Sequence, residues 1–256
     1  MGINKTEAIV LNARELRETS LIATFYTKDF GKISGVIKGV RGARAQYFGG
    51  ALEPFAHDAI VFYEKKASGL FLVSQCELIN FFWALRGDLE RLAYASYLVE
   101  LLDSATPIGE KSGEIFALLA RSLELLCGSA SPRRVARIFE IMLLKRQGMM
   151  PELERCVVCG GKVEGEGRFN LKLGGLVCGP CASSSGAAIP ILRGTREFMR
   201  HIASSDFDRA SRIKVAKEVG REVEVILRKF IDYHIERRLN TVAFLTSIQG
   251  CLLKGA

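Results

Sequence analysis

Two hydrophobic patterns divide the chain near residue 80. Before this point, five short segments rich in β-branched and aromatic residues are bounded by glycine or by polar turns, which is typical of strands. Five strands in about 80 residues predict a small barrel. Their number and length fit the OB type, a five-stranded Greek key, although other small barrels share this strand count. The expected strands are residues 7–11, 20–27, 32–38, 57–64 and 69–76.

After residue 80, apolar residues recur mostly at steps of three and four, which is the period of a helix. Ser131 followed by Pro132 is typical of a helix start, and Gly148 is typical of a helix end. A linker rich in serine and glycine, residues 183–186, precedes the last helical part. The expected helices are 83–103, one from about 115 to 128, 131–148, and a region from 195 to about 239 with a break around residue 205.

Four cysteines give the strongest local signal for chemistry. Cys156 and Cys159 form one C-x2-C pair, and Cys178 and Cys181 form a second, with eighteen residues between the pairs. This spacing is typical of a closed tetrahedral zinc site. Because four thiolates leave no open coordination position, we expect one structural Zn2+ ion and no metal-bound water for catalysis. Two disulfides or a redox pair are the alternatives, and the absence of a signal peptide and of a thioredoxin-like strand context disfavours both.

The residues between the cysteine pairs predict a small hairpin, with 168–173 as one strand, Gly174-Gly175 as the turn and 176–177 as the other strand. The metal would compensate for an apolar core that is too small to fold alone. We therefore expect a mixed α+β protein of several domains, in which a helical bundle contains an inserted zinc module. The expected parts are the barrel at 1–80, a first helical part at 81–155, the zinc module at 156–182 and a second helical part at 183–256.

The chain is basic, with a net charge of +8 and a pI near 9.2, which suggests a polyanionic partner but is weak evidence by itself. The placement of the charges adds to it. Residues 28–50 contain several lysines and arginines against one acid, are rich in glycine, and end near Tyr47 and Phe48. Such a stretch suits a nucleic-acid strand, because phosphates can pair with the cations and bases can stack on the aromatic rings.

A second basic region lies on the last helices, where several cations alternate with glutamates at helical spacing. Pairs such as Glu218 with Arg221 favour a solvated helix face over a surface that binds nucleic acid. The cations of this region are Arg193, Arg196, Arg200, Arg209, Arg212, Lys214, Lys217, Arg221, Arg228 and Lys229.

The sequence lacks the motifs of a membrane protein and of common enzyme classes. No apolar run approaches the roughly 20 residues of a membrane span, and the first residues are polar, so we expect a cytoplasmic protein. Neither a phosphate-binding G-x-x-x-x-G-K-[ST] loop nor a G-x-S-x-G motif occurs. His234-Ile235-Glu236 matches half of a deaminase motif, but it follows the cysteines instead of preceding them. We therefore expect no enzyme activity and no small-molecule substrate.

Several motifs, taken in their order along the chain, resemble the RecO family of recombination mediators, and the likeness covers nearly the whole sequence. In the first part these motifs are Glu7-Ala8-Ile9-Val10-Leu11, Glu18-Thr19-Ser20, Phe25-Tyr26-Thr27, Phe30-Gly31-Lys32-Ile33, Lys38-Gly39-Val40-Arg41 and Leu52-Glu53-Pro54-Phe55. In the second part they are Leu85-Arg86-Gly87-Asp88-Leu89, Ser96-Tyr97-Leu98-Val99-Glu100-Leu101 and Gly148-Met149-Met150-Pro151-Glu152-Leu153, followed by Cys156-Val157-Val158-Cys159-Gly160.

The resemblance implies a non-enzymatic, nucleoid-associated protein of recombinational repair. It would bind single- and double-stranded DNA, anneal complementary strands and, with RecR, help load recombinase on DNA covered by single-strand binding protein. One departure is the stretch Ala43-Arg44-Ala45-Gln46, where relatives usually have further basic and serine residues. A zinc-stapled interaction scaffold without DNA contact is the alternative. The candidate DNA-binding residues are Lys32, Lys38, Arg41 and Arg44, with Arg14 and Arg17 near the barrel edge, and for each of them a solvated surface charge is the competing interpretation.

Overall fold

The computed structural model describes residues 2–40, 48, 52–64, 70–128, 131–235 and 237–252. The chain forms two compact units. The first contains residues 1–132 and 239–256, and the second contains residues 133–238. This division differs from the expected parts, because the last helix belongs to the unit that contains the barrel and not to a bundle with the helices that precede it.

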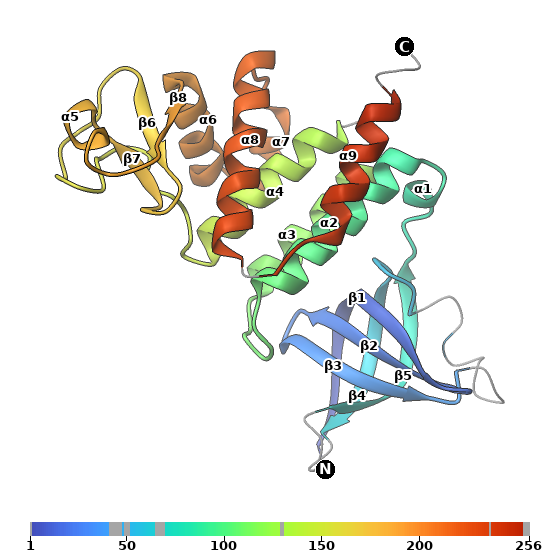
Figure 1. The fold of residues 1–256 in the computed structure, drawn as a ribbon. Helices are drawn as coiled ribbons and strands as arrows, with labels where there is room; N and C mark the ends of the chain where they lie inside the picture. The colour runs from blue at the N-terminus through green and yellow to red at the C-terminus, as the bar shows by residue number, and fades with distance from the viewer. Residues whose placement is uncertain are drawn as a thin grey trace. The chain divides into compact units, whose positions relative to one another are not determined.

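The first unit begins with a closed five-stranded barrel, as expected (Figure 1). Its strands follow one another around the barrel in the order β1-β2-β3-β5-β4, and β4 pairs with β1 to close it. The pair β3 and β5 is parallel, whereas the other pairs are antiparallel. The strands are β1 (Ile3–Arg17), β2 (Ser20–Thr27), β3 (Gly31–Lys38), β4 (His57–Glu64) and β5 (Phe71–Asn80).

Strand β1 is much longer than the predicted segment 7–11. Its first half pairs with β4, from Ile3 opposite Tyr63 to Ile9 opposite His57, and its second half pairs with β2 up to Arg17 opposite Ser20. The strand bends between two partners, with register shifts in its second half. Its ends expose polar residues on both faces, so the hydrophobic pattern marks only its middle.

The barrel interior holds a continuous apolar core that includes Phe25, Ile33, Ile60 and Phe62, each at most 1% exposed. Full burial of one such side chain stabilises the fold by about 1.5–3 kcal/mol. Gly35 allows β3 and β5 to approach closely, because a Cβ atom there would lie 2.6 Å from Cγ2 of Val73.

Four helices complete the first unit: α1 (Trp83–Arg86), α2 (Leu89–Ala105), α3 (Gly113–Cys127) and α9 (Asn240–Leu252). The prediction of one helix over 83–103 is wrong, because the helix stops at Gly87 and restarts at Asp88. The Asp88 carboxylate accepts a hydrogen bond from the Arg91 amide at 3.0 Å and so caps α2. Helix α9 begins where the Glu100 carboxylate of α2 accepts hydrogen bonds from the amides of Asn240 and Thr241 at 2.9 and 2.8 Å.

The second unit contains α4 (Pro132–Arg146) from Arg133 onward, and the start and end of this helix agree with the prediction. Beyond the cysteine region come α6 (Arg193–Ser204), α7 (Phe207–Arg212) and α8 (Lys217–His234). The break near Ser205 is confirmed, and Asp206 starts α7 by accepting a hydrogen bond from the Arg209 amide at 2.8 Å. A second interruption at 213–216 separates α7 from α8 and was not predicted.

The cysteine region forms a small three-stranded sheet in the order β7-β6-β8. The hairpin of β6 (Gly167–Asn170) and β7 (Gly175–Val177) confirms that a hairpin lies here, but its first strand ends at Asn170 instead of residue 173, and Gly175 belongs to β7 and not to the turn. The third strand, β8 (Ile189–Ile191), was not predicted. A short helix, α5 (Gly179–Ala182), follows Cys178. Within the described residues, no helix is long and apolar enough to cross a membrane.

Candidate metal centre and nucleic-acid interface

The four cysteines of the zinc prediction meet in one cluster. The sulfur atoms of Cys156, Cys159, Cys178 and Cys181 all lie within 4.8 Å of one another. The Sγ atoms of Cys159 and Cys178 are 3.8 Å apart, which is far longer than a disulfide bond of about 2.05 Å. A tetrahedral zinc ion with metal–sulfur distances of about 2.3 Å holds its sulfurs roughly 3.8 Å apart. The donor set therefore fits a closed zinc site and not a disulfide.

Two tight turns bring each pair of cysteines together. In the first, the Gly160 amide donates to the Cys156 carbonyl oxygen at 2.8 Å, and Gly160 has φ +72°, which favours glycine. In the second, the Ala182 amide donates to the Cys178 carbonyl oxygen at 2.9 Å. The Cys178 amide also points at the Cys156 sulfur, 3.4 Å away. Burial of the Cys156 thiol opposes ionisation, but hydrogen bonds from backbone amides, chiefly that of Cys159, outweigh it and lower its pKa to about 6.

The turn before the first cysteine is joined to the hairpin by backbone hydrogen bonds. The Glu152 amide donates to the Gly174 carbonyl oxygen at 3.0 Å, and the Leu176 amide donates to the Glu152 carbonyl oxygen at 2.9 Å. Gly175 is required here, since a Cβ atom would lie 2.8 Å from the Glu152 carbonyl oxygen. The two knuckles and the hairpin therefore form one small module.

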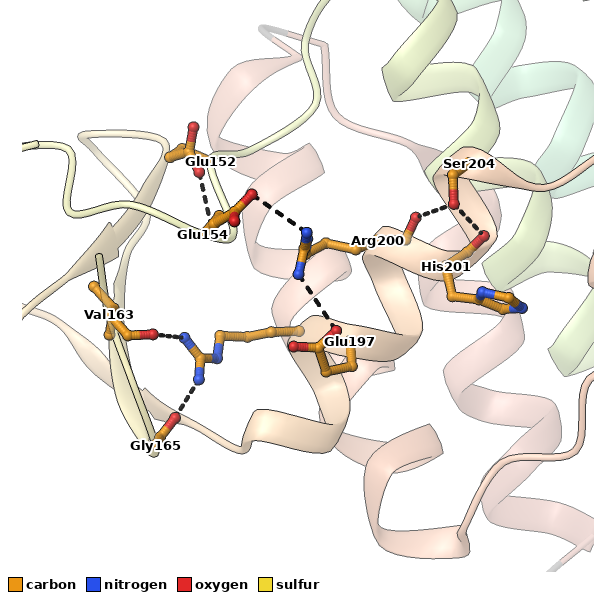
Figure 2. Close-up of polar contacts among 9 residues, drawn as sticks. Glu152, Glu154, Val163, Gly165, Glu197, Arg200, His201 and Ser204 are labelled. Atoms are coloured by element: carbon orange, nitrogen blue, oxygen red, sulfur yellow. Dashed lines mark hydrogen bonds and ion pairs between the residues drawn. The ribbon is translucent and has the colours of Figure 1, made fainter. Parts of the chain in front are cut away.

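Two arginines of α6 fix this module to the helix (Figure 2). Arg196 is 4% exposed, and its guanidinium donates to the carbonyl oxygens of Val163, at 3.0 Å, and of Gly165. Arg200 lies between the carboxylates of Glu154 and Glu197, with nitrogen–oxygen distances of 3.3 Å to each (Figure 2). Both arginines belong to the second basic region of the sequence, and in the structure they contact the module.

The outer face of the barrel carries part of the predicted DNA path. Residues directly opposite each other on paired strands share a face, so the register of β1, β2 and β3 settles which residues point outward. Arg14 pairs with Ile22 and Lys38 pairs with Ser20, while Ala23, Phe25 and Ile37 point into the core. Arg14 and Lys38 are both exposed. The backbone of Arg17 pairs with Ser20 in the same row as Lys38.

Lys32 lies elsewhere and is only 8% exposed. Its ammonium group donates to the main-chain oxygen of Asp103 at 2.5 Å and lies 3.2 Å from the carboxylate of the same residue. Asp103 is in the last turn of α2, where a cation also interacts favourably with the helix dipole. The structure therefore ties Lys32 to α2 and leaves its charge little access to a phosphate.

Of the remaining candidates in the barrel, three lie outside the described residues and one is buried. Arg41, Arg44 and Tyr47 lie outside the described residues, so their roles stay predictions. Phe48 is 5% exposed and belongs to the apolar core of the barrel, which leaves its ring no open face for a base. Among the candidate DNA-binding residues, Arg14 and Lys38 are therefore the ones whose side chains the structure describes as exposed.

The second unit contains a groove. The family resemblance implies a basic, apolar-lined groove among the last helices, but the sequence assigns no residue to it. It has a volume of about 780 Å³ and lies between β8 and α8. Its lining consists of the apolar residues Ile189, Pro190, Val225 and Ile226, the cations Lys217, Arg221 and Lys229, and the acids Glu218 and Glu222. Charged residues alternate in sign along α8. A solvated helix face and the wall of a groove both show this pattern, so the sequence does not distinguish them.

His234 does not join the cysteine cluster. Its ring lies against that of Phe230, with centroids 4.2 Å apart, and its Nε2 atom is 3.2 Å from the Leu171 carbonyl oxygen. Among the described residues, the cluster suited to a metal consists of the four cysteines alone. The deaminase-like motif therefore has no metal partner in this part of the chain.

The chain contains a closed five-stranded barrel and a helical region with a four-cysteine cluster of the kind that binds a metal. These features define its class, a multidomain α+β protein. Comparison with known families makes this specific. The family description "Recombination protein O N terminal" matches residues 1–82, and "Recombination protein O C terminal" matches residues 86–243. The chain belongs to the RecO family, whose members are non-enzymatic mediators.

Curated relatives agree with this assignment over nearly the full length. The chain is 36% identical to the DNA repair protein RecO of Pelotomaculum thermopropionicum over 245 residues, which cover 96% of this chain and 94% of the relative. It is 36% identical to the DNA repair protein RecO of Anaeromyxobacter dehalogenans over 253 residues, or 98% of each chain. It is 32% identical to that of Moorella thermoacetica over 256 residues, which cover 99% and 94%.

Proposed function

We propose that this protein is a recombination mediator of DNA repair, which binds single- and double-stranded DNA and anneals complementary strands. The observation that carries the proposal is the exposed pair of cations, Arg14 and Lys38, on the outer face of a barrel in a chain of the RecO family. The relatives named as DNA repair proteins support the same role.

The proposed mechanism is electrostatic. Two complementary strands repel each other through their phosphates, and lysine and arginine contacts to phosphate reduce this repulsion without sequence preference. Because the cations contact the backbone, the base edges stay free to pair. The strand would cross β1, β2 and β3 in the rows that hold Arg14 and Lys38, and the basic stretch that continues from Lys38 would extend the path. Lys32 is not part of this proposal.

Four thiolates in the observed cluster would hold one Zn2+ ion in a closed shell. When bound, the ion supplies cross-linking between the two knuckles and no open site for chemistry. The proposed function therefore assigns the metal a structural role, and binding of DNA stays with the barrel.

The groove between β8 and α8 suits an acidic peptide with apolar side chains. Its three cations, Lys217, Arg221 and Lys229, outnumber the two glutamates of the lining, and Ile189 and Val225 give it an apolar floor. We propose that it binds the acidic tail of single-strand binding protein, and that RecR joins the complex at a surface that we do not assign. Replacement of Arg221 by glutamate should weaken binding of a fluorescent tail peptide at least about tenfold, whereas replacement of Arg209, which is not in the groove lining, should leave it unchanged.

The experiment that tests the function is annealing of two complementary oligonucleotides coated with single-strand binding protein, followed by fluorescence across a salt series. Acceleration that fades as salt rises is the expected result. A double variant, Arg14→Glu with Lys38→Glu, should reduce the salt slope of DNA binding by roughly 1–2, since each phosphate contact contributes about 0.7–0.9. Arg212→Glu together with Lys214→Glu is the matched control of equal charge, because both residues are exposed and neither lines the groove.

Two results would contradict the proposal. An unchanged salt slope in the barrel variant would move the DNA path away from β1–β3. No annealing, together with no DNA binding, would favour the alternative of a zinc-stapled interaction scaffold. The proposed setting is the cytoplasm, at the nucleoid, where the DNA substrate lies.

A further inference from the structure

The junction between β5 and α1 exposes an aromatic side chain that the proposed DNA path does not use. Trp83, the first residue of α1, is 75% exposed and is the only tryptophan in the sequence. Tryptophan side chains are mostly buried in folded proteins, so this degree of exposure marks a candidate contact surface.

The Trp83 ring is held in place before any ligand binds. It lies against the ring of Phe81, with centroids 4.4 Å apart and an angle of 54° between the planes. The guanidinium of Arg86 lies over the same Phe81 ring at 3.9 Å. Arg86 is in turn fixed by the Pro54 carbonyl oxygen at 3.2 Å and by the Glu53 carboxylate at 3.5 Å. The tryptophan therefore belongs to a supported stack of flat groups.

The backbone between these two rings is strained. Phe82 has φ 52° and ψ 51°, a left-handed conformation that a bulky residue rarely adopts. Its amide donates to Oδ1 of Asn80 at 2.9 Å, and its side chain is 4% exposed. This turn buries Phe82 and leaves Trp83 in solvent.

Through Arg86, the Trp83 stack also contacts the segment that precedes β4. Arg86 contacts Glu53 and Pro54 and lies 5.2 Å from the centroid of the Phe55 ring. In the sequence, two residues separate these three from the cationic stretch 28–50. Nearby carboxylates are matched by cations, Glu53 by Arg86 and Asp88 by Arg91 at 3.6 Å. An exposed indole beside paired charges suits the face of a base better than a phosphate.

We propose that Trp83 is a stacking site for an unpaired base of single-stranded DNA. Every base has a π face, so the indole would accept any of the four, in agreement with annealing that has no sequence preference. The phosphates on either side are left to the cations of the barrel. This inference rests on the proposed function, because it takes single-stranded DNA as the ligand.

The lone tryptophan makes the test direct. Addition of an oligothymidylate should quench Trp83 emission to saturation, whereas a blunt duplex of equal length, whose bases are already stacked, should quench it far less. Trp83→Ala should weaken the affinity for the oligothymidylate by about 5- to 100-fold, measured by anisotropy of labelled DNA, because stacking on one base contributes that much. Its affinity for duplex should change by less than about twofold.

Two further variants keep the test decisive. Trp83→Phe should restore most of the affinity for single strands, since a smaller aromatic face remains. Leu89→Ala removes an exposed apolar side chain of the same junction that has no π face, and it should bind DNA as the unmodified protein does. If the Leu89 and Trp83 variants lost equal affinity for single-stranded DNA, the contact would be apolar docking and not base stacking.

The outcomes separate this inference from the function on which it rests. If the protein binds DNA with a salt-dependent affinity, while emission and the Trp83→Ala affinity are unchanged, the stacking site is wrong and the mediator function stands. If the protein binds no DNA at all, both fail. If Trp83→Ala weakens only the binding of RecR, the surface contacts a protein and the inference is overturned.

Discussion

Asp58 carries a carboxyl group into the barrel, where its side chain is fully buried. Burial raises its pKa from 3.8 to about 6, and the hydrogen bond from the Leu52 amide, at 3.5 Å, only partly opposes this shift. The folded state therefore binds a proton more tightly than the unfolded state. The corresponding stability is fully present below about pH 3.8 and is lost as the pH rises through about 6.

We expect Asp58→Asn to remove this dependence. The amide keeps one oxygen for the Leu52 amide and carries no charge at any of these pH values. The variant should be more stable than the original protein at pH 7, by at most about 3 kcal/mol, and nearly equal to it at pH 4. Urea unfolding at several pH values measures this. If the free energy of unfolding changed with pH in the same way for both proteins, the prediction would be wrong.

Lys32 gives a second prediction for a single residue. Because its buried ammonium group contacts Asp103, Lys32→Met should lower the free energy of unfolding by about 1.5–3 kcal/mol while leaving the salt slope of DNA binding unchanged. The matched control is Lys38→Met on the same strand, which should reduce the salt slope of DNA binding and leave the free energy of unfolding unchanged. Denaturant unfolding and anisotropy of labelled DNA measure the two effects, and a reduced salt slope for Lys32→Met would return this residue to the DNA path.

At the scale of elements, α6 positions the zinc module through Arg196. Arg196→Met removes two hydrogen bonds to carbonyl oxygens that are then left with fewer donors, so the module should be less well held. We expect zinc to pass to a coloured chelator at least about fivefold faster. Arg200→Met is the control, since its ion pairs are exposed and contribute at most about 1 kcal/mol. Equal zinc release from both variants would remove this role of Arg196.

The elements also explain which parts of the fold could be predicted. The five barrel strands and α4 have patterns that are set locally, by alternation, by β-branched residues and by the Ser131-Pro132 start. Strand β8 has three residues, one of them Pro190, and exists because it pairs with β6. Helix α9 depends on Glu100, which is 140 residues away in the sequence. Elements fixed by distant partners leave little local signal.

The candidate sites divide along the same physical line. The cysteine spacing encodes its own geometry, because each knuckle is a local turn, and the structure brings all four sulfurs together. The residue type of a lysine or arginine, in contrast, does not show what its side chain contacts. Lys32 and Lys38 have the same residue type on one strand, and only the packing of α2 against the barrel separates a buried ion pair from an exposed charge. Trp83 gave no periodic signal, since its exposure results from one strained residue.

At the scale of the whole molecule, the four-cysteine cluster lies in the second unit and the proposed DNA path lies in the first. Removal of zinc should therefore destabilise residues 133–238 and spare the barrel. Structural zinc contributes on the order of 10 kcal/mol in small zinc peptides, and each kcal/mol lost lowers the Tm of a unit this size by about 4–8 °C. We expect the Tm of the second unit to fall by more than about 10 °C, while DNA affinity changes by less than about threefold.

Hydrogen exchange followed by mass spectrometry measures the two units separately, before and after chelation. Cys159→Ser should reproduce the effect of the chelator, and Cys127→Ser, which changes a cysteine outside the cluster, should retain close to one zinc per chain. A chelated protein whose second unit exchanges as slowly as before would show that the hairpin and Arg196 hold the module without metal. Faster exchange throughout the barrel as well would show that zinc stabilises the whole chain, because the units would then unfold together.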